Sequence, residues 1–175
     1  TEQLQNHIPL SGKDPSGLGR WCWMTLVGQN ITTRVIVAYE ACTSRKQAHS
    51  ATIAQQRRYW RIHNDDRCSR KIFREQLCQA LQGWRDAGEQ LVLLLDSNEN
   101  MTNGALSRML QHETLQMEDA VKMRSGSDGP NTFIRGSRQI DGAWVTPGLD
   151  VQSACFLPFF LGIGDHRGIL LDISI

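Results

Sequence analysis

Leu91-Val92-Leu93-Leu94-Leu95-Asp96-Ser97-Asn98-Glu99-Asn100 is the stretch that decides the fold. A short, continuous apolar run of this kind predicts a strand that is buried on both faces. The run ends at a carboxylate, so such a strand delivers Asp96 and Asn98 to the edge of a sheet on a rigid element. Enzymes often hold metal ligands and water-orienting groups in such positions. An Asp after an apolar run is also a common turn residue or helix cap, so a functional role for Asp96 requires further polar residues elsewhere in the chain.

Size and composition indicate one globular domain. The chain has 175 residues, of which 40% are apolar and 21% are charged, and this is enough for a sizeable core. The formal net charge of +1 predicts attraction neither to nucleic acid nor to a membrane surface. No apolar segment is long enough to span a membrane, and no secretory signal pattern is visible.

Cysteine usage bears on the compartment. The number of cysteines is odd, and no pair has the Cys-x-x-Cys spacing; they are Cys22, Cys42, Cys68, Cys78 and Cys155. This pattern predicts reduced thiols in an intracellular, cytoplasmic or nuclear, compartment rather than a disulfide framework or a zinc site. The first residue is Thr rather than Met, so we expect a fragment or a processed product.

Strands are predicted at both ends of the chain and helices between them. Residues 1–19 are rich in Pro and Gly and predict a lead-in or loop. Residues 21–27 and 31–39 predict a hairpin with its turn at 28–30. Helices are predicted at 48–62, 69–87, 105–110 and 113–122, and further strands at 91–95, 132–134, 139–145, 151–156 and 168–175. The order predicts an α+β fold, an α/β sandwich of two packed, mostly antiparallel sheets flanked by helices.

Four segments end predicted strands with polar groups. They are Val37-Ala38-Tyr39, Leu95-Asp96-Ser97-Asn98, Gln139-Ile140-Asp141-Gly142-Ala143-Trp144 and Gly162-Ile163-Gly164-Asp165-His166-Arg167-Gly168. Each segment alone has a plain structural explanation. Tyr39 would be an ordinary strand aromatic, Asp96 and Asn98 would form an Asx-turn, Asp141 would end a hairpin, and His166 would be an exposed side chain.

In their order and spacing, these segments resemble the endonuclease/exonuclease/phosphatase superfamily, which includes pancreatic deoxyribonuclease, abasic-site endonucleases, sphingomyelinases and inositol phosphatases. Residues 138–149, RQIDGAWVTPGL, are similar to the family's "RIDYIFVSPGL" segment. A looser resemblance, to endonuclease-like proteins of retroelement-rich genomes, rests on residues 17–21 and 132–136. The resemblance makes Arg20, Arg135 and Arg138 candidates for substrate contact.

The resemblance implies hydrolysis of a phosphate ester by water, with Mg²⁺, or alternatively Mn²⁺, as cofactor. Asp96 would activate or position the attacking water and lie at the metal together with Asp165. Asn98 would hold the phosphate or that water, and Tyr39 would offer its hydroxyl to the phosphate or the leaving oxygen.

The resemblance also implies roles for the two remaining residues. His166 would donate to a non-bridging phosphate oxygen and stabilise charge in the transition state. Asp141 would accept from the other imidazole nitrogen, which fixes the tautomer and favours the protonated form.

The match covers roughly the C-terminal two-thirds of a family domain, when judged against usual domain sizes. The family's N-terminal strands are missing, including the strand whose glutamate is a principal metal ligand. Residues 20–175 are therefore interpreted as a partial domain. Glu40 and Glu99 are the nearest candidates to replace that ligand.

Two functions from different classes follow. The first is a metal-dependent phosphodiester hydrolase, favoured as a nuclease, with activity expected for the parent protein. The second is a non-enzymatic relic of the same fold that acts as a binding or self-assembling subunit. Basic residues between Arg57 and Arg74, together with the tryptophans, favour nucleic acid, and DNA over RNA, as partner. A solvated helical face is the alternative for that charge run. A truncated sandwich would also expose sheet edges, so we expect self-association or pairing with a missing N-terminal segment.

Overall fold

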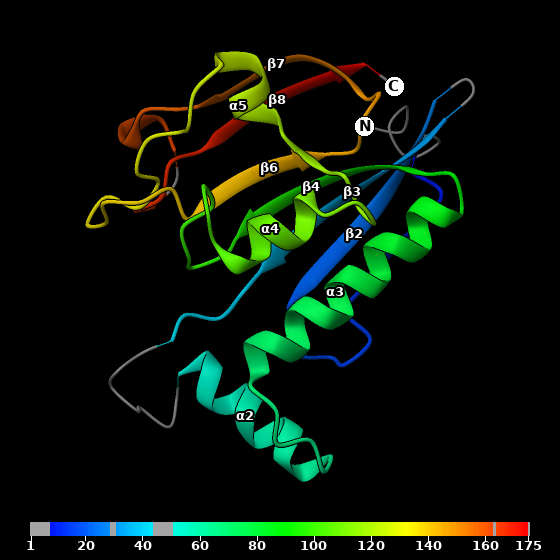
Figure 1. Ribbon diagram of the computed structural model, residues 1–175, viewed down its shortest axis with the longest axis vertical. Coiled ribbons are helices and arrows are strands. Elements are labelled where there is room, and N and C mark those ends of the chain that lie inside the picture. The colour runs from blue at the N-terminus through cyan, green and yellow to red at the C-terminus, as the bar shows by residue number, and fades with distance from the viewer. Residues whose placement is uncertain (1–7, 29–30, 44–50, 163, 175) are drawn as a thin grey trace.

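The computed structural model describes residues 8–28, 31–43, 51–162 and 164–174. In these residues, six strands form one sheet in the order β1-β2-β3-β4-β6-β5, and two strands form a second sheet, β7-β8 (Figure 1). The strands are β1 (Ser11–Lys13), β2 (Trp21–Val27), β3 (Thr32–Tyr39), β4 (Gln90–Asp96), β5 (Glu118–Asp119), β6 (Asp141–Val145), β7 (Asp150–Phe156) and β8 (Ile169–Ser174). The predicted α+β class is confirmed.

β4 is the central strand of the large sheet, as its sequence predicts. It pairs in parallel with β3 and antiparallel with β6. Leu91, Leu93 and Leu95 face a core that contains Phe73, Leu77 and Leu81 of α3 (Ser69–Asp86). Val92 faces the opposite way, into a second cluster with β6 and β7. Burial on both faces is the reason that the strand has no polar alternation.

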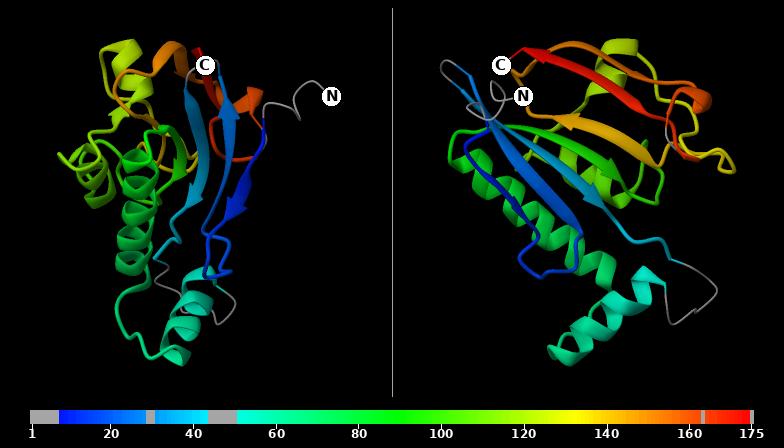
Figure 2. Two further views of the ribbon diagram at one scale, coloured as in Figure 1. Left: turned by 90° about the vertical axis from the view of Figure 1, so that its right-hand side faces the viewer. Right: turned by 180° about the vertical axis from the view of Figure 1, so that it is seen from behind.

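Helices cover one face of the large sheet (Figure 2). α3 and α4 (Ala105–Gln111) lie on this face, and α2 (Thr52–Ile62) packs against α3 near the end of the sheet. α3 confirms the predicted helix at 69–87, because its apolar stripe is the buried face. Gly88 follows at φ +83°, the left-handed conformation that commonly ends a helix.

The second sheet covers only part of the other face. β7 and β8 contribute Val151, Ala154 and Ile173 to the cluster around β4 and β6. α5 (Ala120–Ser125) lies beside β7. Val37 of β3 lies opposite Leu94, on this same face of the sheet, and remains 52% exposed. The part of the face formed by β2 and β3 is therefore open.

Three local predictions differ from the structure. The predicted lead-in at 1–19 contains β1, which pairs with β2. The predicted strand at 132–134 is only a single bridge, between Phe133 and His166. In place of a helix over 113–122, β5 pairs with β6, and α5 starts at Ala120 with the Asp119 carboxylate accepting from two backbone N–H groups at its first turn. The central residues of the predicted turn at 28–30 and the predicted helix start at 48 lie outside the described residues.

The hairpin of β2 and β3 is confirmed. All five cysteines are free thiols. Among the described helices, none combines the length and the apolar character needed to cross a membrane.

Candidate active site

Three neighbouring strands bring polar side chains into one row. Tyr39 at the end of β3 lies opposite Asp96 at the end of β4, and Asp96 lies opposite Asp141 at the start of β6. Residues directly opposite each other in a sheet project to the same face, with Cβ atoms about 5 Å apart. Tyr39, Asp96 and Asp141 therefore stand side by side, on the face that β7 and β8 partly cover.

His166 joins this row from the loop that precedes β8. Its Nδ1 lies 2.9 Å from Oδ2 of Asp141. The Asp141 side chain is 12% exposed and the His166 side chain 34% exposed, so the carboxylate is sheltered while the imidazole reaches solvent. Burial lowers the pKa of His166, but the hydrogen bond and charge of Asp141, with the charges of Asp96 and Asp165, outweigh it and raise the pKa above its usual value. The imidazole thus favours its protonated form, in which Nε2 carries a proton.

Thr132 holds Asp141 in place. The Thr132 hydroxyl oxygen accepts from the backbone N–H of Ile140 at 2.9 Å and of Asp141 at 3.0 Å. Phe133, the next residue, packs against the His166 ring with 5.2 Å between centroids. The sequence pattern assigns no role to Thr132, and its only signal is its position in the segment 132–136, which carries the looser family resemblance.

Asp96, Asp141 and His166 form a group that could hold a metal ion. One ligand atom from each residue lies within 4.8 Å of the ligand atoms of the other two. Among the described residues, this is the group of three such side chains that meets this distance. Burial, followed by the charge of Asp141, raises the pKa of Asp96 to about 6. Two carboxylates that repel each other in a partly buried site suit a hard divalent cation, which prefers oxygen ligands. The donor set therefore fits such an ion.

Asn98 holds the ends of two strands together. Asn98 adopts the left-handed conformation, with φ +48°, and its backbone N–H donates to Oδ1 of Asp96 at 3.1 Å. This is the Asx-turn that the sequence allowed as an alternative. The side-chain amide donates to the backbone oxygen of Glu40, just after β3, at 2.9 Å. The Asn98 side-chain nitrogen thus already donates to Glu40, and the side-chain oxygen takes no part in this hydrogen bond.

Glu40 and Glu99 bind arginines next to the site. The Glu40 side chain is fully buried and accepts from Arg74 Nε at 2.6 Å and also from Arg70. Arg74 reaches Glu99 at 2.7 Å, and Arg70 donates to the backbone oxygen of Ser97 at 3.0 Å. Burial raises the pKa of Glu40, and the hydrogen bonds and charges of the two arginines oppose that rise. Part of the predicted basic stretch is therefore internal.

The remaining predicted residues lie farther out. Asp165 is exposed, and its Oδ2 is 3.4 Å from Arg135 Nη2; it is not part of the three-residue group. Arg138 is exposed on the same loop region. Arg20, by contrast, is buried and forms a two-point ion pair with Asp14, at 2.6 and 2.8 Å. Its guanidinium also donates to Gln76 at 2.6 Å, so the structure gives Arg20 packing partners inside the protein.

Solved structures share this arrangement of elements. The catalytic domain of human Nocturnin matches with a TM-score of 0.59 at 20% identity, over 88% of this chain and 52% of that one. A 3′ phosphatase, NExo from Neisseria, solved with a product DNA hairpin, matches with a TM-score of 0.66 at 14% identity, over 96% and 72%. The chain has the endonuclease/exonuclease/phosphatase fold. The catalytic domain of Xenopus laevis APE2 also matches, with a TM-score of 0.59 at 12% identity, over 89% and 55%.

The matches to known proteins are matches to solved structures. No protein-family model matches the sequence, and no curated protein matches it. The chain spans about half to three-quarters of the length of these three structures, 52% to 72%.

Proposed function

We propose that this chain carries the Asp–His half of a divalent-metal-dependent phosphodiester hydrolase that acts as a nuclease. The observation that carries the proposal is the convergence of Asp96, Asp141 and His166 within one group, with His166 oriented by Asp141 at 2.9 Å. Asp96 and Asp141 meet through the register of β4 and β6, and His166 joins them from the loop before β8.

Each side chain has a role in attack by water on a phosphodiester. Asp96 accepts the proton of the attacking water, a task suited to a carboxylate with a pKa of about 6. The His166 Nε2 proton is directed to a non-bridging oxygen, where charge develops in the transition state. Asp141 keeps the imidazole protonated and fixed. The Tyr39 hydroxyl, in the same row, donates to the phosphate or the leaving oxygen, and the Asn98 side-chain oxygen helps to orient the water.

A metal ion would be held by Asp96 and Asp141, and we propose Mg²⁺, with Mn²⁺ as substitute. Such an ion neutralises charge on the phosphoryl oxygens when bound. Asp165 lies next to His166 in the chain and would contribute through a water molecule. Magnesium keeps several waters, so two direct carboxylates suffice.

Nucleic acid is the proposed substrate, with DNA favoured. The NExo structure contains a product DNA hairpin. The exposed Arg135 lies over the Phe133 ring, which packs against His166, and Arg138 is exposed on the same segment. Guanidinium groups near a hydrolytic centre suit a phosphate backbone.

Cleavage assays test the proposal. Supercoiled DNA, single-stranded RNA and bis-p-nitrophenyl phosphate are incubated with the chain and Mg²⁺, with Asp96→Asn and His166→Ala beside it. We expect cleavage that EDTA abolishes and that each substitution lowers at least about a hundredfold. Asp172→Asn, an exposed carboxylate on β8, is the matched control and retains full activity. Cleavage that survives both site substitutions overturns the assignment.

A non-enzymatic subunit of this fold is the second candidate. The observation that favours it is the open face of the large sheet, with exposed Met24 and Val37. Apolar sheet faces of this kind invite association with another chain. Sedimentation equilibrium tests it: a concentration-dependent dimer that Val37→Lys dissociates, with no hydrolysis by any form, favours this function over the first.

A further inference from the structure

The turn that carries Asp96 and Asn98 is held from two sides. On the side of β6, the backbone oxygen of Ile140 accepts from the backbone N–H of Ser97 at 2.9 Å and from its hydroxyl at 2.8 Å. On the side of α3, Arg70 Nη2 donates to the backbone oxygen of Ser97 at 3.0 Å. Ser97 is completely buried, so this oxygen cannot turn to water if the arginine is removed. The position of Ser97 therefore sets the positions of the two neighbouring side chains.

Arg70 also holds the residue that follows β3. The same Nη2 forms an ion pair with the carboxylate of Glu40, whose side chain is fully buried. The backbone N–H of Glu40 donates to the backbone oxygen of Asp96 at 2.8 Å. The backbone oxygen of Glu40 accepts from the side-chain amide of Asn98 at 2.9 Å. One arginine nitrogen thus joins the ends of β3 and β4 at the point where the proposed chemistry takes place.

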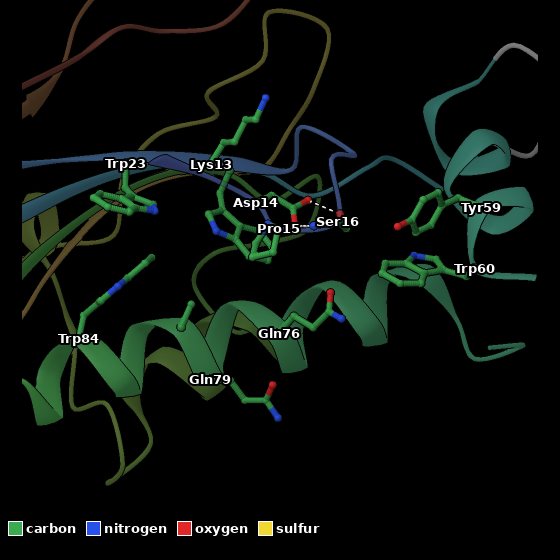
Figure 3. A pocket seen from close by; sticks show the side chains of 12 residues that line it. Lys13, Asp14, Pro15, Ser16, Trp23, Tyr59, Trp60, Gln76, Gln79 and Trp84 are labelled. Carbon is green, nitrogen blue, oxygen red and sulfur yellow. Dashed lines mark hydrogen bonds between the residues drawn. The ribbon is translucent and has the colours of Figure 1, made fainter. Parts of the chain in front are cut away.

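α3 gives Arg70 a rigid base. Arg70 lies in the first turn of this helix, and the turns that follow are anchored by buried apolar side chains, Ile72, Phe73 and Leu77. Gln76 anchors the helix further, because its side-chain oxygen accepts from the buried Arg20 at 2.6 Å. Figure 3 shows Gln76 projecting from α3 toward the segment that carries Asp14. A group mounted on such an element holds its partners more precisely than a group on a loop.

The arginine is engaged within the protein. Its side chain is 11% exposed, and Nη2 has a third acceptor nearby, the Glu99 carboxylate at 3.5 Å. Any effect of Arg70 on a bound phosphodiester is therefore expected to pass through the turn. A role of this kind changes the rate of the chemical step more than the binding of substrate.

We propose that Arg70 is a positioning residue for the hydrolytic site, an inference that rests on the proposed function. By holding Ser97 and Glu40 together, it fixes the turn before substrate binds. The Asp96 carboxylate and the Asn98 side-chain oxygen then meet the attacking water in one orientation. Displacement of a reacting group by about 1 Å can cost about a hundredfold in rate, so a clamp of this kind has a measurable kinetic effect.

Steady-state kinetics test the proposal with the full chain, with bis-p-nitrophenyl phosphate as substrate and Mg²⁺ present. Arg70→Gln removes the charge and shortens the side chain. We expect kcat to fall about tenfold to a hundredfold, with KM changed by less than about twofold. Arg70→Lys keeps a positive charge and a donor, and it loses less than Arg70→Gln does.

Arg34→Gln is the matched control. The Arg34 side chain is also buried, at 6% exposed, and its Nε forms an ion pair with Glu89 at 2.6 Å. It lies opposite Leu91, near the start of β4, and so far from the turn at the other end of that strand. This variant loses stability in urea unfolding for the same reason as Arg70→Gln, but its kcat stays within about twofold of the wild-type value.

A second measurement does not depend on hydrolysis. Hydrogen exchange of the Asn98 side-chain amide is followed by NMR without metal or substrate. The proton that is bonded to the Glu40 oxygen is expected to exchange at least about tenfold faster in Arg70→Gln than in the wild type, and at the wild-type rate in Arg34→Gln. Near-ultraviolet circular dichroism shows whether each variant is folded.

Three results overturn the proposal: wild-type kcat and wild-type Asn98 exchange in Arg70→Gln, a raised KM at constant kcat, which would indicate direct substrate contact, or equal losses in Arg34→Gln. An inactive wild type overturns the nuclease assignment instead. In that case faster Asn98 exchange in Arg70→Gln still supports the positioning role, and unchanged exchange still refutes it.

Discussion

Replacement of Asp14 by asparagine tests whether Arg20 serves the fold or the substrate. Both side chains of the ion pair are almost completely buried, with 1% of Arg20 and none of Asp14 exposed. Asp14→Asn leaves a buried guanidinium without its counter-charge, and breaking such a pair costs about 3–5 kcal/mol. With an m-value of about 2 kcal/mol per molar urea, the unfolding midpoint falls by about 2 M.

The pH dependence of this effect has a definite sign. Burial raises the pKa of Asp14, but the hydrogen bonds from Arg20 and Ser16 and the Arg20 charge outweigh it and hold the pKa below its usual value. A carboxylate with a lowered pKa contributes stability above its unfolded pKa, near 3.8, and loses it as the pH falls through the folded value. The difference in stability between wild type and Asp14→Asn is therefore constant from pH 5 to pH 7 and shrinks below pH 3.8.

Urea titrations followed by tryptophan fluorescence measure both effects. The exposed pair of Arg61 and Asp66 supplies the matched control, and Asp66→Asn leaves the midpoint unchanged within error. The double variant Asp14→Leu/Arg20→Met recovers most of the loss, because an apolar pair of similar volume replaces both charges. Two outcomes refute the packing role assigned to Arg20. The first is a loss of unfolding free energy below about 1 kcal/mol in Asp14→Asn. The second is a loss in the double variant Asp14→Leu/Arg20→Met that equals the sum of the losses in the two single variants.

Three further outcomes follow from the site. Asp141→Asn lowers the pKa of His166, because it removes the hydrogen-bonded charge that raises it; NMR titration of the imidazole measures this, and an unchanged pKa contradicts the pairing. Mg²⁺ at a hundred times its Kd raises the free energy of unfolding by about 2.7 kcal/mol, and Asp96→Asn abolishes the shift in thermal denaturation; equal stabilisation of both forms speaks against the metal group. Asn98→Ala loses both its bond to Glu40 and its tolerance of the left-handed conformation, at a cost of about 2 kcal/mol in urea unfolding, whereas Asn98→Gly, which tolerates that conformation, loses less.

The sequence was informative wherever a local pattern decided the structure. The run Leu91 to Leu95 specified a doubly buried strand because both of its faces meet apolar clusters. The stripe of α3 specified its buried side for the same reason. The order of the strand-end motifs predicted a common site, and the register explains why: Tyr39, Asp96 and Asp141 are direct neighbours across three strands.

Sequence patterns failed where distant partners decided the outcome. Glu118 and Asp119 form a strand because they pair with the edge of β6. The local sequence around them contains no pattern that predicts this pairing. Arg70 and Arg74 belong to a charge run that predicts a solvated face. Their partner Glu40, however, follows β3 and is separated from α3 in the sequence by α2. The same holds for Trp60, whose neighbour Arg20 is the residue before β2. In each case tertiary pairing outweighed local composition.

The arginine pair next to the site also limits which carboxylates can serve a metal. Glu40 and Glu99 are the acids that sequence position alone suggested as replacement ligands. In the structure, Arg74 bridges them and Arg70 contacts both. If either glutamate turned toward a metal, a largely buried arginine would lose its counter-charge, at a cost of about 3–5 kcal/mol. Asp96 and Asp141 lie opposite each other, and burial, followed by the charge of Asp141, raises the pKa of Asp96 to about 6. Binding of a cation would relieve repulsion at the two aspartates but would break ion pairs at the two glutamates, so Asp96 and Asp141 are the carboxylates that we propose for the metal.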